Sequence, residues 1–261
     1  MHNLFIIKIG GSIIDDESKM NSFLNDFSLI KEKKILVHGG GKLATRLALQ
    51  LGIEQKMTGG RRITDAETLK IVTMVYAGFI NKNIVARLQA NGCNAVGLTG
   101  ADGNSILAHK RTAGETDYGF AGDIDEINTY FITRLLDQET DIVFAPITHD
   151  KKGQLLNTNA DTIAQELATA MSAAYQVTLI YGFEKPGVLM DADNDDTVIP
   201  EIDASYYQEL KAANVIFAGM IPKLDNAFAA IKKGVNKVVI GKAENLQLLA
   251  RGNSGTTITN G

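Results

Sequence analysis

The chain has 261 residues, of which 45% are hydrophobic and 21% charged, and its net charge is -4 at pH 7. This composition is typical of a folded globular protein, and the length allows one large α/β domain or two lobes that share a sheet. The sequence has one cysteine (Cys93), no basic run and no apolar stretch of about 20 residues, which argues against an internal disulfide and against nucleic acid or a membrane as partners. We therefore expect a cytoplasmic protein.

Helix and strand patterns alternate along almost the whole chain. Short apolar runs predict strands buried on both faces, and apolar residues at helical spacing predict amphipathic helices between them. The expected helices cover residues 17–33, 42–52, 65–91, 129–137, 160–173, 204–213, 220–233 and 244–249. The expected strands cover residues 4–9, 34–37, 94–98, 105–110, 119–127, 141–145, 175–181, 237–240 and 255–258, with hairpins at 56–64 and around 151–153 and a polar loop at 183–203. This alternation predicts an α/β fold, a three-layer αβα sandwich with a mainly parallel central sheet.

The first strand contains a lysine within a run of apolar residues. Lys8 interrupts this run and is followed by Gly10 and Gly11. A lysine in a buried strand must reach the strand end or a charged partner, because burying its ammonium group alone is costly. Two interpretations stay open on this segment alone: an anion site made of the lysine and an amide-rich turn, or a buried strand whose lysine extends to solvent.

Further polar clusters follow other predicted strands, at residues 39–41 and 157–161, and Lys223 lies near the start of a late helix. Ligands of open α/β sheets bind at the carboxyl ends of the strands, so we expect these clusters to meet there. Neither glycine cluster matches the P-loop or the dinucleotide fingerprint. The four histidines share no metal spacing and the acidic residues at 191–196 lack the order of a calcium loop, so no protein metal site is predicted.

Eight segments, in order along the chain, carry a resemblance to a known family. They are residues 7–12 (IKIGGS), 37–41 (VHGGG), 62–65 (RITD), 97–104 (GLTGADGN), 119–124 (GFAGDI), 154–161 (QLLNTNAD), 218–223 (AGMIPK) and 255–258 (GTTI). The sequence resembles the amino acid kinase family, and within it the enzymes that phosphorylate N-acetylglutamate. The resemblance implies one amino acid kinase domain over residues 1–261. Its N-terminal lobe, 1–174, would bind acylglutamate and dimerise, and its C-terminal lobe, 175–261, would bind ATP.

The resemblance implies that ATP with Mg²⁺ phosphorylates the side-chain carboxylate of N-acetyl-L-glutamate, the second step of arginine biosynthesis. A carboxylate with a pKa of about 4 is ionised at neutral pH and needs no general base. The sequence accordingly lacks a histidine or cysteine–histidine pattern for nucleophilic catalysis. The obstacle is the approach of one anion to another, so catalysis depends on positioning and on positive charge around the transferred phosphoryl group.

The family pattern implies a catalytic role for three residues and nucleotide contacts for two more. Lys8 and Lys223 would flank the transferred phosphoryl group and contact the nucleotide, and Asp161 would fix both lysines and keep them protonated. Gly10 and Gly11 would bind the nucleotide phosphates. Mg²⁺ is expected on these phosphates, with few or no protein ligands.

Four further residues would bind the acylglutamate. The amides of Gly40 and Gly41 would face the carboxylate that is phosphorylated. Arg62 would hold the α-carboxylate, for which its planar fork is suited. Asn157 would hydrogen-bond the acylamino group.

Two segments depart from the family pattern. Residues 181–185 stand where the family has Thr-Asp or Ser-Asp near the nucleotide, so no adenine contacts are assigned there. Residues 58–62, near the acyl group, are atypical, so N-succinyl-L-glutamate is an alternative substrate. A kinase of the same fold acting on carbamate, glutamate, aspartate or UMP is also compatible with the sequence, as is a non-catalytic nucleotide sensor. The chain begins at its first strand, without the extra N-terminal helix of arginine-inhibited relatives, so we expect a homodimer without arginine feedback.

Overall fold

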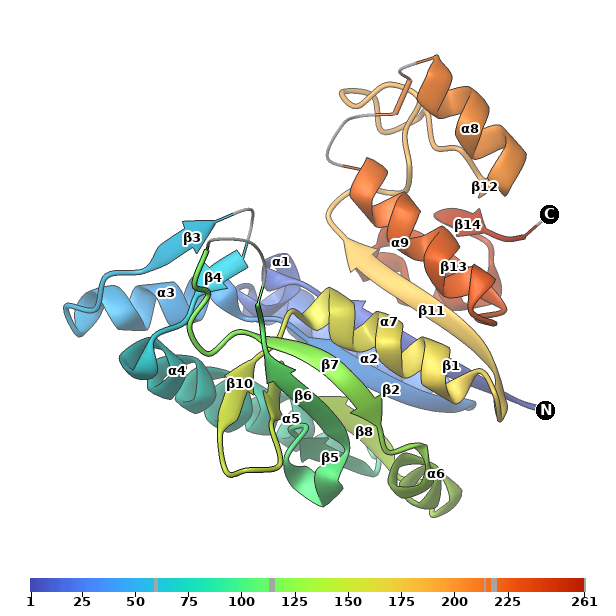
Figure 1. Cartoon of the computed structure of the whole chain (residues 1–261). Coiled ribbons are helices and arrows are strands. Elements are labelled where there is room, and N and C mark those ends of the chain that lie inside the picture. The colour runs from blue at the N-terminus through green and yellow to red at the C-terminus, as the bar shows by residue number, and fades with distance from the viewer. Residues whose placement is uncertain (59–60, 113–115, 214, 217–219, 261) are drawn as a thin grey trace.

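The computed structural model describes residues 1–58, 61–112, 116–213, 215–216 and 220–260 (Figure 1). Its centre is an eight-stranded sheet with the order β12-β14-β13-β11-β1-β2-β8-β5. The strands are β1 (His2–Ile9), β2 (Lys33–His38), β5 (Ala95–Leu98), β8 (Asp141–Phe144), β11 (Tyr175–Phe183), β12 (Glu201–Ile202), β13 (Lys237–Lys242) and β14 (Thr256–Ile258). Neighbouring strands are parallel except β13 and β14, so the prediction of a mainly parallel sheet is confirmed.

Helices cover both faces of this sheet. One face carries α1 (Gly11–Ile14), α2 (Glu17–Leu29), α3 (Gly41–Gln50), α4 (Ala66–Thr73), the π-helix η1 (Met74–Ile80), α5 (Asn81–Ala90) and α10 (Leu246–Arg251). The other face carries α6 (Thr129–Asp137), α7 (Ala160–Met171), α8 (Ala204–Ala212) and α9 (Ile221–Lys232). The predicted three-layer αβα arrangement is therefore confirmed.

Strand β1 shows why the central sheet is apolar on both faces. Successive side chains of a strand point to opposite faces. Leu4 and Ile6 belong to the cluster under α7 and α9, while Phe5, Ile7 and Ile9 belong to the cluster under α2 and α10. Full burial of such a side chain contributes about 1.5–3 kcal/mol, so this one strand anchors both halves of the core.

A smaller sheet and a hairpin lie next to the central sheet. The smaller sheet has the order β10-β9-β6-β7, from β6 (Ile106–Lys110), β7 (Gly122–Ile127), β9 (Ile147–His149) and β10 (Leu155–Asn157). The hairpin pairs β3 (Lys56–Thr58) with β4 (Arg61–Ile63), as predicted, and its turn at 59–60 lies outside the described residues. Figure 1 shows the hairpin at one end of the molecule and α8 at the other, with β1 and β11 between them.

Four elements differ from the expectation. The helix expected over residues 17–33 ends at Leu29, and β2 already begins at Lys33. The single helix expected over residues 65–91 is helical throughout, but η1 interrupts it with one stretch of wider turns. The glycine turn after β1 leads directly into the short helix α1, and the loop expected at 183–203 ends in the short strand β12. Within the residues described, no helix is both long enough and apolar enough to span a membrane.

We expect Gly119→Ala to lower the free energy of unfolding by about 2–4 kcal/mol. Gly119 has a φ of +66° and forms a bridge with Thr64, and a Cβ there would collide with the Thr64 carbonyl oxygen. Gly52→Ala is the matched control, because Gly52 has a φ of +72° but nothing within 4 Å of an added Cβ. It should cost only the left-handed backbone strain of about 1–2 kcal/mol. Urea unfolding of both variants tests this, and equal losses would contradict the role of the collision.

Candidate functional site

A cavity of about 260 Å³ lies at the carboxyl ends of β1 and β2. Eight of the nine site residues predicted from the sequence line it: Lys8, Gly10, Gly11, Gly40, Gly41, Arg62, Asn157 and Asp161. The ninth, Lys223, lines an adjacent cavity of about 360 Å³ together with Gly10 and Gly11. The structure thus brings all nine residues to one edge of the sheet, where the two cavities share the glycine turn after β1. Their individual roles stay predictions.

An ion pair compensates the buried charge of Lys8. Strand alternation directs Lys8 to the face of α7 and α9. Its Nζ lies 2.9 Å from Oδ1 of Asp161, and its side chain is only 11% exposed. Asp161 is in the first turn of α7, which Asn159 caps by accepting a hydrogen bond from the Thr162 amide. The helix start therefore places a carboxylate where the lysine needs it.

Lys223 approaches the same place from the first turn of α9, in the part of the chain that follows β11. Burial lowers the pKa of Lys223, the nearby charge of Asp161 raises it, and the positive charge of Lys8 lowers it further. Its Nζ lies 3.7 Å from the centroid of the Phe183 ring. Two ammonium groups from opposite halves of the chain thus converge beside one carboxylate.

The second glycine turn joins β2 to α3. Gly40 has a φ of +144°, and a Cβ at this position would collide with Ile80 of η1. Only a glycine fits here, so the backbone can pass close to the helix and direct α3 into the cavity. Gly41 is the first residue of α3 and also lines the cavity. The free N–H groups and positive end of the helix dipole favour an anion there.

His38 is a neutral residue that hydrogen-bonds the backbone of the second glycine turn. Its ring is fully buried, with Nδ1 2.8 Å from the Gly39 carbonyl oxygen and Nε2 3.3 Å from Nδ2 of Asn81. The neutral tautomer with its proton on Nδ1 donates to Gly39 and accepts from Asn81. Burial lowers the pKa of His38 to about 4, and the positive charge of Lys82 adds to this effect.

We expect acid to destabilise the protein through His38. In the unfolded chain this histidine has a pKa of about 6.5, so between pH 6.5 and 4 the unfolded state binds a proton that the native state does not. The contribution of neutral His38 to the free energy of unfolding is complete above pH 6.5. As the pH falls to 4, roughly 3 kcal/mol of this contribution is lost. Urea unfolding at pH 7 and pH 5 should show a smaller decrease for His38→Gln than for the wild type. Equal decreases in both proteins would contradict this prediction.

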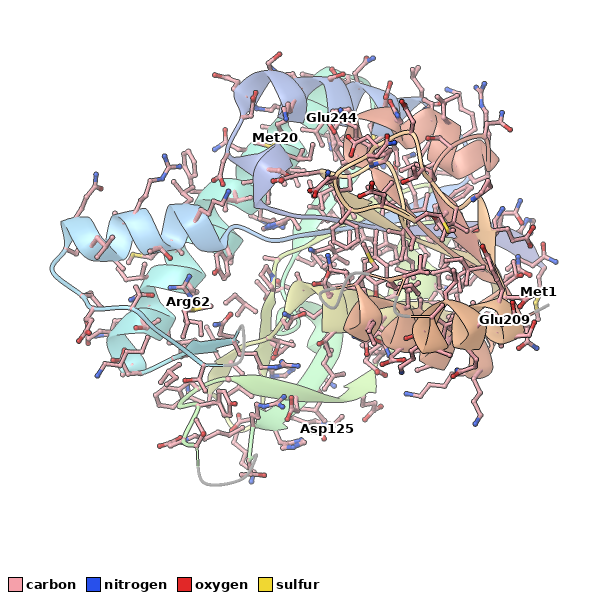
Figure 2. All side chains as sticks on the ribbon, turned by 90° about the horizontal axis from the view of Figure 1, so that it is seen from above. Met1, Met20, Arg62, Asp125, Glu209 and Glu244 are labelled. Carbon is pink, nitrogen blue, oxygen red and sulfur yellow. The ribbon has the colours of Figure 1, made fainter. Side chains whose placement is uncertain are left out.

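Arg62 lies on β4 beside α3 (Figure 2). Its guanidinium donates to the side-chain oxygen of Gln55, to the Gly41 carbonyl oxygen at 3.0 Å and to Oγ1 of Thr45 at 3.0 Å. All three partners are neutral, and no carboxylate among the described residues pairs with Arg62. The side chain is therefore held in place with its positive charge uncompensated, as a carboxylate ligand requires.

Asn157, the last residue of β10, is also held by its neighbours. Its Nδ2 donates to Oγ1 of Thr64 at 3.0 Å, and its backbone bridges to Ala121. These contacts leave its side-chain oxygen available to a donor in the cavity.

Sequence reasoning did not identify three residues that line these cavities. Tyr76 of η1 reaches the cavity beside Arg62. The pKa of its hydroxyl is raised, because the effect of burial outweighs the opposite effect of the Arg62 guanidinium. Phe183 and Lys42 line the adjacent cavity. A tyrosine on the buried face of a long helix carries no local sign that it lies at a site. The segment containing Phe183 stands out in the sequence only as a departure from the family pattern.

A third cavity, of about 590 Å³, continues from Lys223 and Met220 and is lined by apolar residues that include Val188, Leu189 and Ile216. Across the residues that the structure describes, no group of three histidine, cysteine or acidic side chains is arranged to hold a metal ion. The cavities are instead lined by lysines, backbone amides and apolar groups, which suit an anion with an apolar portion.

Comparison with known proteins agrees with this geometry. The model of the amino acid kinase family matches residues 3–242. The chain is 58% identical to a protein named acetylglutamate kinase from Phocaeicola vulgatus, over 91% of this chain and 92% of that protein, and 57% identical to one from Cytophaga hutchinsonii, over 94% of each. The crystal structure of smu.665 from Streptococcus mutans matches with a TM-score of 0.79 at 28% identity, over 99% of both chains. This chain belongs to the amino acid kinase family.

Proposed function

We propose that this protein uses ATP to phosphorylate the side-chain carboxylate of N-acetyl-L-glutamate, as an acetylglutamate kinase of arginine biosynthesis. The observation that carries the proposal is the meeting of Lys8, Asp161 and Lys223 where two cavities share the Gly10–Gly11 turn. The relatives with 54–58% identity that carry the name acetylglutamate kinase support the choice of substrate.

The acylglutamate would occupy the smaller cavity. Its α-carboxylate would bind Arg62, whose fork suits a planar carboxylate, and its acylamino N–H would donate to Asn157. Its side-chain carboxylate would then point to the amides of Gly40 and Gly41 at the start of α3. This orientation directs the reacting oxygen toward the two lysines.

The chemical step needs no proton transfer. One oxygen of the substrate carboxylate forms a bond to the γ-phosphorus, the bond from that phosphorus to the β,γ-bridging oxygen breaks, and its electron pair stays on ADP. The products are an acyl phosphate and ADP. Lys8 and Lys223 would balance the charge on the phosphoryl oxygens, and removal of one such donor costs roughly 2.7–4 kcal/mol of transition-state stabilisation in comparable sites.

The nucleotide would extend from the Gly10–Gly11 turn into the apolar cavity beside Val188 and Ile216, which supports ATP binding by residues 175–261 and acylglutamate binding by residues 1–174. Mg²⁺ would enter on the phosphates of ATP and neutralise part of their charge. The lysines and backbone amides of this chain would bind the phosphate oxygens that remain.

A hydroxylamine assay tests the proposal, because hydroxylamine converts an acyl phosphate to a hydroxamate, which forms a coloured complex with Fe³⁺. The purified protein with MgATP is given N-acetylglutamate, N-succinylglutamate, glutamate, aspartate or carbamate in separate reactions. We expect hydroxamate from an acylglutamate and none from free glutamate. No product with either acylglutamate would overturn the proposal, and nucleotide binding without product would favour a sensor.

A second candidate substrate is N-succinyl-L-glutamate. Arg61 lines the same cavity as Arg62, so a second guanidinium is available for the extra carboxylate of a succinyl group. A higher kcat/KM with the succinyl compound in the hydroxylamine assay would establish this substrate.

We also propose that the protein is a cytoplasmic homodimer. Met74 and Phe79 of η1 are 55% and 63% exposed, and they line an apolar hollow of about 510 Å³ with Leu43 and Leu47 of α3. Large exposed apolar groups that gather on one face are typical of an interface. The single cysteine is compatible with a reducing compartment. Light scattering after gel filtration should give twice the mass of 28.1 kDa.

A further inference from the structure

Phe183, the last residue of β11, lies close to both lysines of the site. The centroid of its ring is 3.7 Å from Nζ of Lys223 and 5.7 Å from Nζ of Lys8. An ammonium group within about 6 Å of a ring centroid is attracted by the negative face of the ring. Lys8 has Asp161 as its ion-pair partner, whereas no carboxylate among the described residues lies within 4.0 Å of Lys223. The ring is therefore the nearest favourable electrostatic partner of Lys223.

The position of the ring is fixed by the sheet. Phe183 pairs with Lys242 of β13, and its ring stacks on Tyr181 with centroids 6.1 Å apart and planes at 21°. Tyr181 is buried, and its hydroxyl donates to the backbone oxygen of Asp161 at 3.5 Å. The ring is thus tied through Tyr181 to the helix that carries the carboxylate partner of Lys8.

We propose that Phe183 is a positioning residue whose ring holds the charged ammonium group of Lys223 at the point of phosphoryl transfer without neutralising it. This inference rests on the proposed kinase function. A carboxylate at this position would cancel the charge that the phosphoryl group needs and would repel the nucleotide. An aromatic ring attracts the cation, carries no net charge and does not compete with phosphate for hydrogen bonds.

The surroundings of Lys223 explain why such a partner is needed. Burial and the neighbouring charge of Lys8 both disfavour its protonated form, and Asp161, which favours it, is already paired with Lys8. A flexible lysine also loses side-chain entropy when it is fixed in one conformation. The ring offsets part of both costs before the substrate binds, which lowers the reorganisation required during transfer.

A graded change of the ring tests the proposal. Phe183 is replaced by 4-fluoro-, 3,5-difluoro- and 3,4,5-trifluorophenylalanine, which keep its shape while they withdraw negative charge from its face. We expect kcat for acylglutamate phosphorylation to fall with each fluorine, by about tenfold at three fluorines, with KM for acylglutamate unchanged. Phe183→Trp should keep activity and Phe183→Leu should lose at least as much as the trifluoro variant.

Phe228 provides the matched control. It lies on the same helix as Lys223 and stacks on Tyr207 with centroids 5.0 Å apart. The same fluorinated residues at Phe228 should leave kcat unchanged, because Phe228 holds no lysine of the site. A kcat that stays constant across the series at Phe183, or that falls equally in the series at Phe228, would overturn the proposal.

A spectroscopic measurement separates this proposal from the kinase assignment. NMR spectra are recorded of protein whose lysines carry ¹³C at the ε-carbon, and the Lys223 signal is assigned by its loss in Lys223→Arg. We expect the Phe183 ring to shift the ε-protons of Lys223 upfield. The shift should disappear in Phe183→Leu. A Lys223 signal at the ordinary position in the wild type would overturn the proposal. Failure of the kinase assignment would be recognised separately, as a wild-type protein that forms no hydroxamate while this signal still responds to Phe183→Leu.

Discussion

Lys8→Met is expected to lower kcat for acylglutamate phosphorylation by roughly 10²–10³-fold, with little change in KM for acylglutamate. Methionine keeps the length and apolar packing of the side chain in β1 but removes its charge. The loss has two sources, since the phosphoryl oxygens lose a cation and Asp161 is left as an uncompensated negative charge beside them. Steady-state kinetics with the coupled release of ADP measures both parameters.

The control for this variant is Lys19→Met. Lys19 also forms an ion pair, with Glu244 at 3.2 Å, but it lies on α2 with 43% of its side chain exposed. A surface pair of this kind contributes about 0–1 kcal/mol to stability. The kcat of Lys19→Met should therefore match that of the wild type. A Lys8→Met enzyme with wild-type kcat would remove Lys8 from the chemistry.

Arg62→Lys is expected to raise KM for acylglutamate by about 10–100-fold while kcat changes by no more than a few fold. Lysine keeps the positive charge but loses the planar fork that can bind both oxygens of a carboxylate. It also cannot keep all three contacts that hold Arg62, to Gln55, Gly41 and Thr45. The variant therefore separates geometry from charge in substrate binding.

Arg61→Lys is the companion measurement, because Arg61 is the neighbouring guanidinium of the same cavity. With N-acetylglutamate its KM should stay near that of the wild type. With N-succinylglutamate a rise in KM comparable to that of Arg62→Lys would assign Arg61 to the third carboxylate. An Arg62→Lys enzyme whose KM for both acylglutamates is unchanged would contradict the assignment of Arg62.

The fold and much of the site could be predicted because their signals are local. Lys8 was visible as a charge in an apolar strand, and the glycine turns were visible after the first two strands. Because helices and strands alternate along the chain, the lysine and both glycine turns were expected at one edge of a parallel sheet, and the structure confirms this. The polar cluster at 157–161 was also visible in the sequence, and the family resemblance implied the roles of Asn157 and Asp161, which line the same cavity.

The remaining features depend on contacts between distant residues. The π-helix η1 widens a helix whose apolar spacing looks regular, so the approach of Tyr76 to Arg62 could not be predicted. In the sequence, Phe183 cannot be distinguished from other apolar residues at the end of a strand. Its relation to Lys223 arises only because α9, which starts at Ile221, begins next to it.

The place of β1 in the sheet also affects how the protein is made. β1 is the first strand of the chain, yet it lies between β2 and β11 at the centre of the sheet. At a synthesis rate of about 5–20 residues per second, β11 leaves the ribosome roughly 10–35 s after β1. During that interval the edge of β1 that will pair with β11 displays free N–H and C=O groups, which can template pairing with another chain. Completion of the candidate site is then a late event of folding, and until then the open edge of β1 is a point where the nascent chain can pair with another chain.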